Sequence, residues 1–125
     1  MATFYVASAF SNKEKVAAIV QMLRAMGHEV SHDWTQQEYA YTQHAAIHAQ
    51  EDREGVESCT HFIALFDEPL KPLNTYVELG IALGLHKHIF VIGDCDKDCI
   101  FSRLPGIQRF ATLDEFLQVA KGRLV

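Results

Sequence analysis

Two carboxylic acids and a phenol are candidates for acid–base or nucleophilic chemistry: Glu78, Asp52 and Tyr5. A glutamate one turn into a helix at the carboxyl edge of a sheet can point toward the crevice where ligands bind. Each residue also has a structural interpretation. Glu78 fits a capping box that starts at Thr75, Tyr5 fits the packing of a strand, and Asp52 fits a solvated helix face. A chemical role therefore depends on the combination of the three.

Strands and helices alternate along the chain. The Ser/Thr-x-x-Glu pattern of a capping box occurs at residues 11–14, 75–78 and 112–115, so helices are expected to start at Ser11, Thr75 and Thr112. Gly27 should end the first helix, and a polar stretch from Thr42 to Ser58 predicts another. Strands are expected at Thr3 to Ala7, His28 to His32, His61 to Phe66, His88 to Ile92 and Gln108 to Phe110.

This alternation, with a near-continuously apolar strand at His61 to Phe66, predicts a parallel sheet covered by helices on both faces. Right-handed crossovers then give an α/β, doubly wound, flavodoxin-like or Rossmann-like three-layer sandwich of about five strands. No linker or repeat divides residues 1–125, so we expect a single domain. Ligands should bind outside the carboxyl ends of the strands, where the strand order reverses.

Composition narrows the class of protein. The 125 residues are 49% hydrophobic and 22% charged, with a net charge of -5, which disfavours a nucleic-acid polymer as partner. No apolar run reaches the roughly 18 residues of a membrane span, and the N-terminus lacks a signal-peptide pattern. Three cysteines do not suggest a disulfide framework, so we expect a cytoplasmic protein with reduced thiols.

The apparent metal motifs are incomplete. His44 and His48 are spaced as on one helix face but lack the glutamate of the zinc-peptidase motif. The segment from Asp94 to Cys99 starts like a calcium loop, yet it lacks the glycine at position six and has Pro105 at position twelve. Its two cysteines have no second pair, as a zinc site would need. We expect no metal and no cofactor.

Three segments together resemble the nucleoside 2-deoxyribosyltransferase family and the related deoxynucleoside 5'-monophosphate N-glycosidases. They are Phe-Tyr-Val-Ala-Ser around Tyr5, His-Ala-Gln-Glu-Asp-Arg-Glu-Gly-Val around Asp52, and Asn-Thr-Tyr-Val-Glu-Leu-Gly-Ile-Ala around Glu78. The resemblance covers nearly the whole chain. It is most specific from Thr75 to Ala82 and in the following segment from His86.

The resemblance implies cleavage or transfer at the N-glycosidic bond of a 2'-deoxynucleoside or its 5'-monophosphate. Glu78 would attack C1' and form a covalent glycosyl-enzyme, Tyr5 would hold that carboxylate, and Asp52 would protonate the departing base. Water would then make the protein a hydrolase, and a second base would make it a transferase. Amide dipoles at the helix start are expected to keep Glu78 ionised.

The same crevice should hold the substrate. The amides of the loop before the first helix are suited to a 5'-phosphate or 5'-hydroxyl, and the rings of Phe10 and Trp34 to stacking on a base. Many family members carry an acidic residue and a glycine before the threonine, where this chain has Pro72 to Asn74, so Asp67 or Glu68 is expected to substitute. The expected substrate-binding residues are Ser8, Phe10, Ser11, Asn12, Trp34, Asp67, Asn74 and Thr75.

Two other functions fit the same fold. One is a TIR-like NAD glycohydrolase, which also has a glutamate on a helix near the sheet edge. The other is a non-catalytic nucleotide-binding module, although such a module would not need Tyr5, Asp52 and Glu78 together. The resemblance also implies a homodimer or higher homo-oligomer, with an interface predicted on Ala45, Ala46, Ile47 and Ala49.

Overall fold

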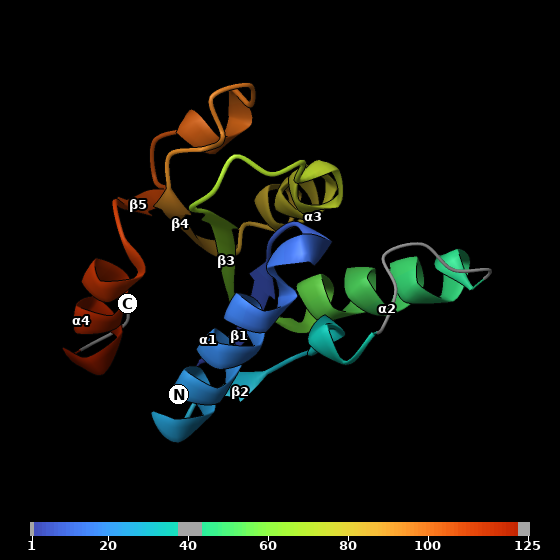
Figure 1. The fold of residues 1–125 in the computed structure, drawn as a ribbon, viewed down its shortest axis with the longest axis horizontal. Helices are drawn as coiled ribbons and strands as arrows, with labels where there is room; N and C mark the ends of the chain where they lie inside the picture. The colour runs from blue at the N-terminus through green and yellow to red at the C-terminus, as the bar shows by residue number, and fades with distance from the viewer. Residues whose placement is uncertain (1, 38–43, 123–125) are drawn as a thin grey trace.

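The computed structural model describes residues 2–37 and 44–122. Within them, helices alternate with five strands (Figure 1). The strands are β1 Thr3–Ala7, β2 Glu29–Val30, β3 His61–Phe66, β4 His88–Gly93 and β5 Gln108–Phe110. The α-helices are α1 Lys13–Ala25, α2 Ala45–Ser58, α3 Leu73–Gly84 and α4 Leu113–Gly122.

The five strands form one parallel sheet in the order β2-β1-β3-β4-β5. Figure 1 shows α1 and α4 on one face of this sheet and α2 and α3 on the other. All six residues of β3 are buried, as a central parallel strand requires. The predicted doubly wound α/β sandwich is confirmed. The strand order reverses between β1 and β3, which places the ligand crevice at their carboxyl ends.

Two helices begin at other residues than the capping patterns predict. Residues Phe10–Asn12 form a short 3-10 turn, so α1 begins at Lys13 and Ser11 lies exposed before it. The α3 helix begins at Leu73, directly after Pro72. Proline is tolerated at the start of a helix, but it disfavours helical structure in the residues before it. Glu78 is therefore the sixth residue of α3, beyond the reach of the predicted cap.

The third capping pattern forms in a modified way. The Thr112 hydroxyl accepts a hydrogen bond from the Glu115 amide at 3.2 Å, as in a capping box. The Glu115 carboxylate accepts from the amide of Ala111 at 3.0 Å, one residue earlier than expected.

The second strand and second helix are shorter than predicted. β2 is an edge strand that pairs only with β1, and its two residues Glu29–Val30 replace the expected five. α2 begins at Ala45, and the first two residues of its predicted range, 42 and 43, lie outside the described residues. The predicted β3 and β5 ranges match those observed, and β4 continues one residue further, to Gly93.

One glycine lets α2 lie close to the sheet. A Cβ atom added at Gly55 would lie 2.7 Å from the Cβ of His32 and 3.0 Å from two ring carbons of Tyr5. A side chain at this position would push α2 away from β1 and from the end of β2.

We expect Gly55→Ala to lower the free energy of unfolding by about 1–3 kcal/mol, because the backbone must move to remove this overlap. Gly80→Ala is the matched control, since Gly80 is also inside a helix but faces open space. That change should be neutral or slightly stabilising. Urea unfolding of the two variants measures the difference, and equal midpoints would contradict the packing described.

Candidate active site

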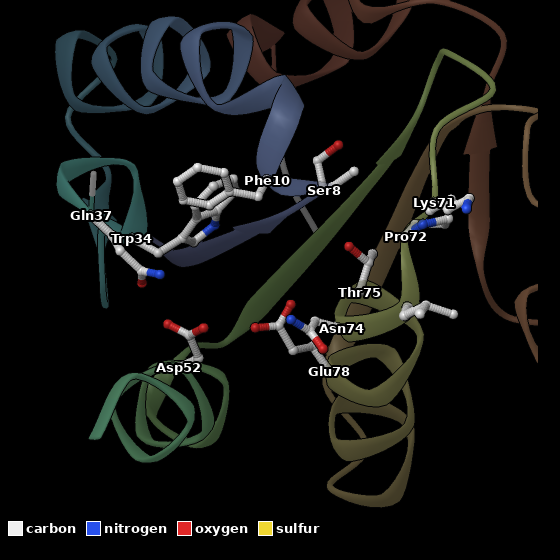
Figure 2. A pocket seen from close by; sticks show the side chains of 12 residues that line it. Ser8, Phe10, Trp34, Gln37, Asp52, Lys71, Pro72, Asn74, Thr75 and Glu78 are labelled. Atoms are coloured by element: carbon white, nitrogen blue, oxygen red, sulfur yellow. The ribbon is translucent and has the colours of Figure 1, made fainter. Parts of the chain in front are cut away.

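A cavity of about 290 Å³ opens at the carboxyl ends of β1 and β3, where the topology predicts a ligand site (Figure 2). Its walls come from the segment after β1, the end of β2, α2, and the loop that leads into α3. The lining residues are Ser8, Ala9, Phe10, Trp34, Gln37, Asp52, Lys71, Pro72, Leu73, Asn74, Thr75 and Glu78.

Tyr5 and Glu78 form a buried hydrogen bond beneath this cavity. The Tyr5 hydroxyl donates to Glu78 Oε2 at 2.6 Å, across 73 residues of sequence. The Tyr5 ring stacks on Phe62 with an interplanar angle of 7°, which fixes its direction. Burial, and then the negative charges of Glu78 and Asp52, raise the pKa of Tyr5 well above its ordinary value. Tyr5 therefore stays protonated and serves as a permanent donor.

Burial raises the pKa of Glu78 to about 8. The Tyr5 hydrogen bond opposes this shift, the charge of Asp52 adds to it, and His32 lowers it. The expectation that helix dipoles keep Glu78 ionised is wrong, because the side chain lies in the second turn of α3 and is almost fully desolvated.

Asp52 faces the same space from α2. Figure 2 shows the carboxyl groups of Asp52 and Glu78 both directed into this space, with the rings of Phe10 and Trp34 on another side of it. Asp52 Oδ1 also lies 3.3 Å from Nε2 of His32, within ion-pair distance. Sequence reasoning missed His32. Its position directly before Asp33 and Trp34, at the end of a predicted strand, was the available signal.

An aromatic pair forms the opposite wall. Trp34 is 8% exposed, and its indole N–H donates to the carbonyl of Val6 at 2.7 Å. The Phe10 ring lies 6.2 Å from the Trp34 ring at an angle of 36°. Trp34 is thus packed into the core and also lines the cavity, and its stacking on a base stays a prediction.

Three predicted binding residues lie outside the cavity lining: Ser11, Asn12 and Asp67. Ser8 does line the cavity, but its hydroxyl donates to the Leu65 carbonyl at 2.9 Å and accepts from Asn12 Nδ2 at 3.1 Å. The same Asn12 group donates to Asp67 at 3.1 Å. Asp67 also pairs with Lys15 at 2.5 Å. These side chains tie the ends of β1 and β3 to α1, and substrate contacts by Ser11, Asn12 and Asp67 stay predictions.

The loop into α3 supplies the remaining polar groups. Thr75 is 1% exposed, and its hydroxyl has no hydrogen-bond partner among the described residues although it lies at the cavity. Asn74 is exposed beside it. Sequence reasoning missed Gln37 and Lys71. Lys71 is an exposed cation on this loop, and its position between two prolines, which favour a turn, could have indicated it.

The described part of the chain contains no group of three or more histidine, cysteine, aspartate or glutamate side chains placed to hold a metal ion. Across residues 2–37 and 44–122, no helix has the length and apolarity that crossing a membrane requires.

The fold is shared with solved enzymes that act on nucleosides or nucleotides. A 2-deoxyribosyltransferase from Bacillus psychrosaccharolyticus aligns with a TM-score of 0.73 and 16% identity, over 98% of this chain and 92% of that one. The CMP N-glycosidase BcmB from Clostridium botulinum gives 0.60 and 19%, over 93% and 95%. A 2-deoxyribosyltransferase from Leishmania mexicana gives 0.62 and 12%, over 98% and 99%. A search of curated proteins gives no match.

The sequence itself defines the family. Residues 1–104 match the family model described as nucleoside 2-deoxyribosyltransferase, and the chain belongs to this family. The family and the structural neighbours support an enzyme acting at the N-glycosidic bond of nucleosides. The predicted resemblance is confirmed.

Proposed function

We propose that this protein breaks the N-glycosidic bond of a 2'-deoxynucleoside or its 5'-monophosphate by way of a covalent glycosyl-enzyme on Glu78. The observation that carries this proposal is the buried 2.6 Å hydrogen bond from Tyr5 to Glu78, at a cavity that Asp52 faces from the opposite helix. A carboxylate held by one donor, with an acid across the cleft, is the arrangement of a retaining glycosidic mechanism.

In this reaction the ionised Glu78 attacks C1' of the deoxyribose while the bond from C1' to the base nitrogen breaks. Tyr5 keeps its proton and directs the carboxylate. Asp52 gives a proton to the departing base, which leaves more readily as a neutral molecule. Water or a second base then attacks C1' and releases Glu78, so the acceptor decides between hydrolase and transferase.

The test is base release from a panel of deoxynucleosides, their 5'-monophosphates and NAD, each with and without a second free base. Chromatography monitors the released base. We expect base release from a deoxy substrate by the wild type and loss of that release in Glu78→Gln. New nucleoside formed only with the acceptor base identifies a transferase, and free sugar identifies a hydrolase. Cleavage of NAD alone would support the TIR-like alternative. Binding without turnover of any substrate would support a nucleotide-binding module.

Tyr5→Phe tests the hydrogen bond to Glu78. A hydrogen bond to a charged group contributes about 1.5–3 kcal/mol, so its loss should raise the Glu78 pKa by about one to two units above its value of about 8. Fewer molecules then carry ionised Glu78 at pH 7, and kcat/KM should fall by about 10- to 100-fold. Carboxyl carbon NMR measures the pKa directly. Tyr76→Phe is the control, and an unchanged Glu78 pKa in Tyr5→Phe would refute this role.

We also propose a homo-oligomer, at least a dimer, formed through the side of the molecule that α2 and α3 share. Both helices carry exposed apolar side chains: Ile47 on α2 is 57% exposed, and Leu73 and Val77 on α3 are 68% and 65% exposed. Leu73 also lines the cavity, which places this surface at the cavity rim. Light scattering of the wild type and of Val77→Lys should show an oligomer and its dissociation.

A further inference from the structure

His32, which lies just after β2, contacts Asp52 of α2. His32 Nε2 lies 3.3 Å from Asp52 Oδ1, and both side chains are only about a quarter exposed, at 28% and 26%. His32 is not among the described residues that line the cavity, so it meets Asp52 without touching the space for substrate. The mechanism proposed above has no use for this residue.

The backbone holds this pair together. The Ser31 hydroxyl donates to the carbonyl of Gly55 at 2.6 Å, which joins the end of β2 to α2 immediately beside His32. The absence of a side chain at Gly55 lets α2 approach the Cβ of His32 closely. Asp52 lies one helical turn before Gly55 on α2. The histidine is thus placed beside the carboxylate before any substrate binds.

The charged groups around His32 are acidic. Asp52 and Glu51 approach from α2, Asp33 is its neighbour in the chain, and Glu78 lies across the cleft. The short-range interaction with Asp52 raises the pKa of His32 above its ordinary value, and burial opposes that shift without cancelling it. The imidazolium form therefore persists to a higher pH than in a free histidine.

We propose that His32 acts through Asp52 as a positioning and proton-supplying residue, so that the imidazolium and the carboxyl group work as one acid toward the departing base. This inference rests on the proposed function of Glu78. His32 is not a catalytic residue in the sense of touching substrate. Its role is to restore the proton that Asp52 gives away.

The protons balance over one turnover. In the first half, the bond between Glu78 and C1' forms and the bond from C1' to the base breaks, with its electron pair going to the base. At rest Asp52 is ionised beside the imidazolium. As the base departs, Asp52 relays the Nε2 proton of His32 to it, so His32 becomes neutral and Asp52 ends this half ionised, as it began. In the second half, water attacks C1' and Glu78 leaves. The proton released by water passes through Asp52 to His32, and the imidazolium is restored.

The test is the pH dependence of kcat/KM for His32→Gln, measured beside Asp52→Asn and Glu78→Gln. Wild-type kcat/KM should rise with pH as Glu78 ionises and fall again as His32 loses its proton. His32→Gln should lose the fall at high pH, keep the rise, and be slower by about 10²-fold at the wild-type optimum. His32→Gln added to Asp52→Asn should have little further effect, because the two residues act as a unit.

Leaving-group dependence separates proton supply from a structural role. Two probe pairs are used, each as nucleoside and as 5'-monophosphate: 2'-deoxyuridine against 5-fluoro-2'-deoxyuridine, and 2'-deoxyguanosine against 7-methyl-2'-deoxyguanosine. The second member of each pair has a base that departs with less need of a proton. His32→Gln should be slow on the first member and much closer to the wild type on the second.

Controls make each outcome decisive. His88→Gln removes an exposed imidazole at the amino end of β4, the opposite edge of the sheet, and should match the wild type. An unaltered pH profile in His32→Gln, or an equal loss on both members of a pair, would overturn the proposal while leaving Glu78 in place. Full activity of Glu78→Gln would instead overturn the proposed function. If His32→Gln does not fold, the wild type alone tests the proposal. Its fall in kcat/KM at high pH should nearly vanish when the substrate is the second member of a probe pair, whose base needs less protonation to depart.

Discussion

Glu78→Gln should lower kcat for base release by about 10³-fold or more, because it removes the proposed nucleophile and with it the proposed covalent route. Glutamine has almost the same shape as glutamate, and its amide oxygen can still accept the hydrogen bond from Tyr5. The pocket should therefore still bind substrate, with KM changed far less than kcat. Single-turnover measurements of base release check this result.

The same substitution should stabilise the fold, and more so at high pH. The pKa of Glu78 is about 8 in the folded protein and 4.5 as its reference value, so the folded state binds the proton more tightly than the unfolded state. Stability supplied by the protonated form is fully present below pH 4.5 and is lost as pH rises through 8. Glutamine does not titrate, so the Tm advantage of the variant should widen from pH 5 to pH 8 and then level off.

Glu14→Gln is the matched control for both measurements, since Glu14 is an exposed glutamate in the first turn of α1. It should change neither kcat nor the pH dependence of Tm. A Glu78→Gln protein that keeps its activity and loses stability at every pH would show that Glu78 is a structural residue only.

Asp96→Asn should be the most destabilising of the substitutions considered, at about 3 kcal/mol. The Asp96 side chain has no exposed surface and accepts hydrogen bonds from Ser102, Arg103 and Arg109. Arg109 binds it with two nitrogens, at 3.1 Å and 2.7 Å, and also donates to the Gly93 carbonyl at 2.8 Å. Loss of the negative charge leaves two guanidinium groups without their counter-ion. Denaturant unfolding measures the cost.

This cluster should also make the protein sensitive to acid. Burial alone would raise the pKa of Asp96, but the hydrogen bonds from Arg109 and Ser102 and the two arginine charges hold it below its ordinary value. Stability from this group is therefore present above the unfolded pKa near 4 and is lost as pH falls through the lower folded pKa. Asp98→Asn, on the exposed part of the same loop, should leave both properties unchanged.

The periodicity of apolar residues was sufficient to predict the sheet. β3 and β5 match the predicted residues because their apolar and turn-forming boundaries are local features of the sequence. The starts of α1 and α3 were not predicted correctly, since a 3-10 turn and a proline compete with the capping pattern. Such competition is decided by the whole segment and its packing.

The candidate site, like the fold, was predicted from the sequence only in part. Strand ends placed Trp34 and Phe10 at one edge, and the family resemblance brought Tyr5, Asp52 and Glu78 together. The raised pKa of Glu78 was not predicted, because it depends on how completely α3 buries a carboxylate that the sequence leaves in an ordinary helical position. His32 was missed for a related reason. Its partner is 20 residues away, and only the close approach at Gly55 brings the two together.

The hydrogen-bonded chain from Ser8 through Asn12 to Asp67 has a consequence for how this enzyme could diversify. These groups are committed to joining β1, β3 and α1, so a change in any of them would disturb the fold together with the cleft. The opposite rim, Lys71 to Asn74, is largely exposed and separate from that chain. New substrate preferences could arise by replacing these four residues, while the chemistry proposed for Glu78 is inherited unchanged.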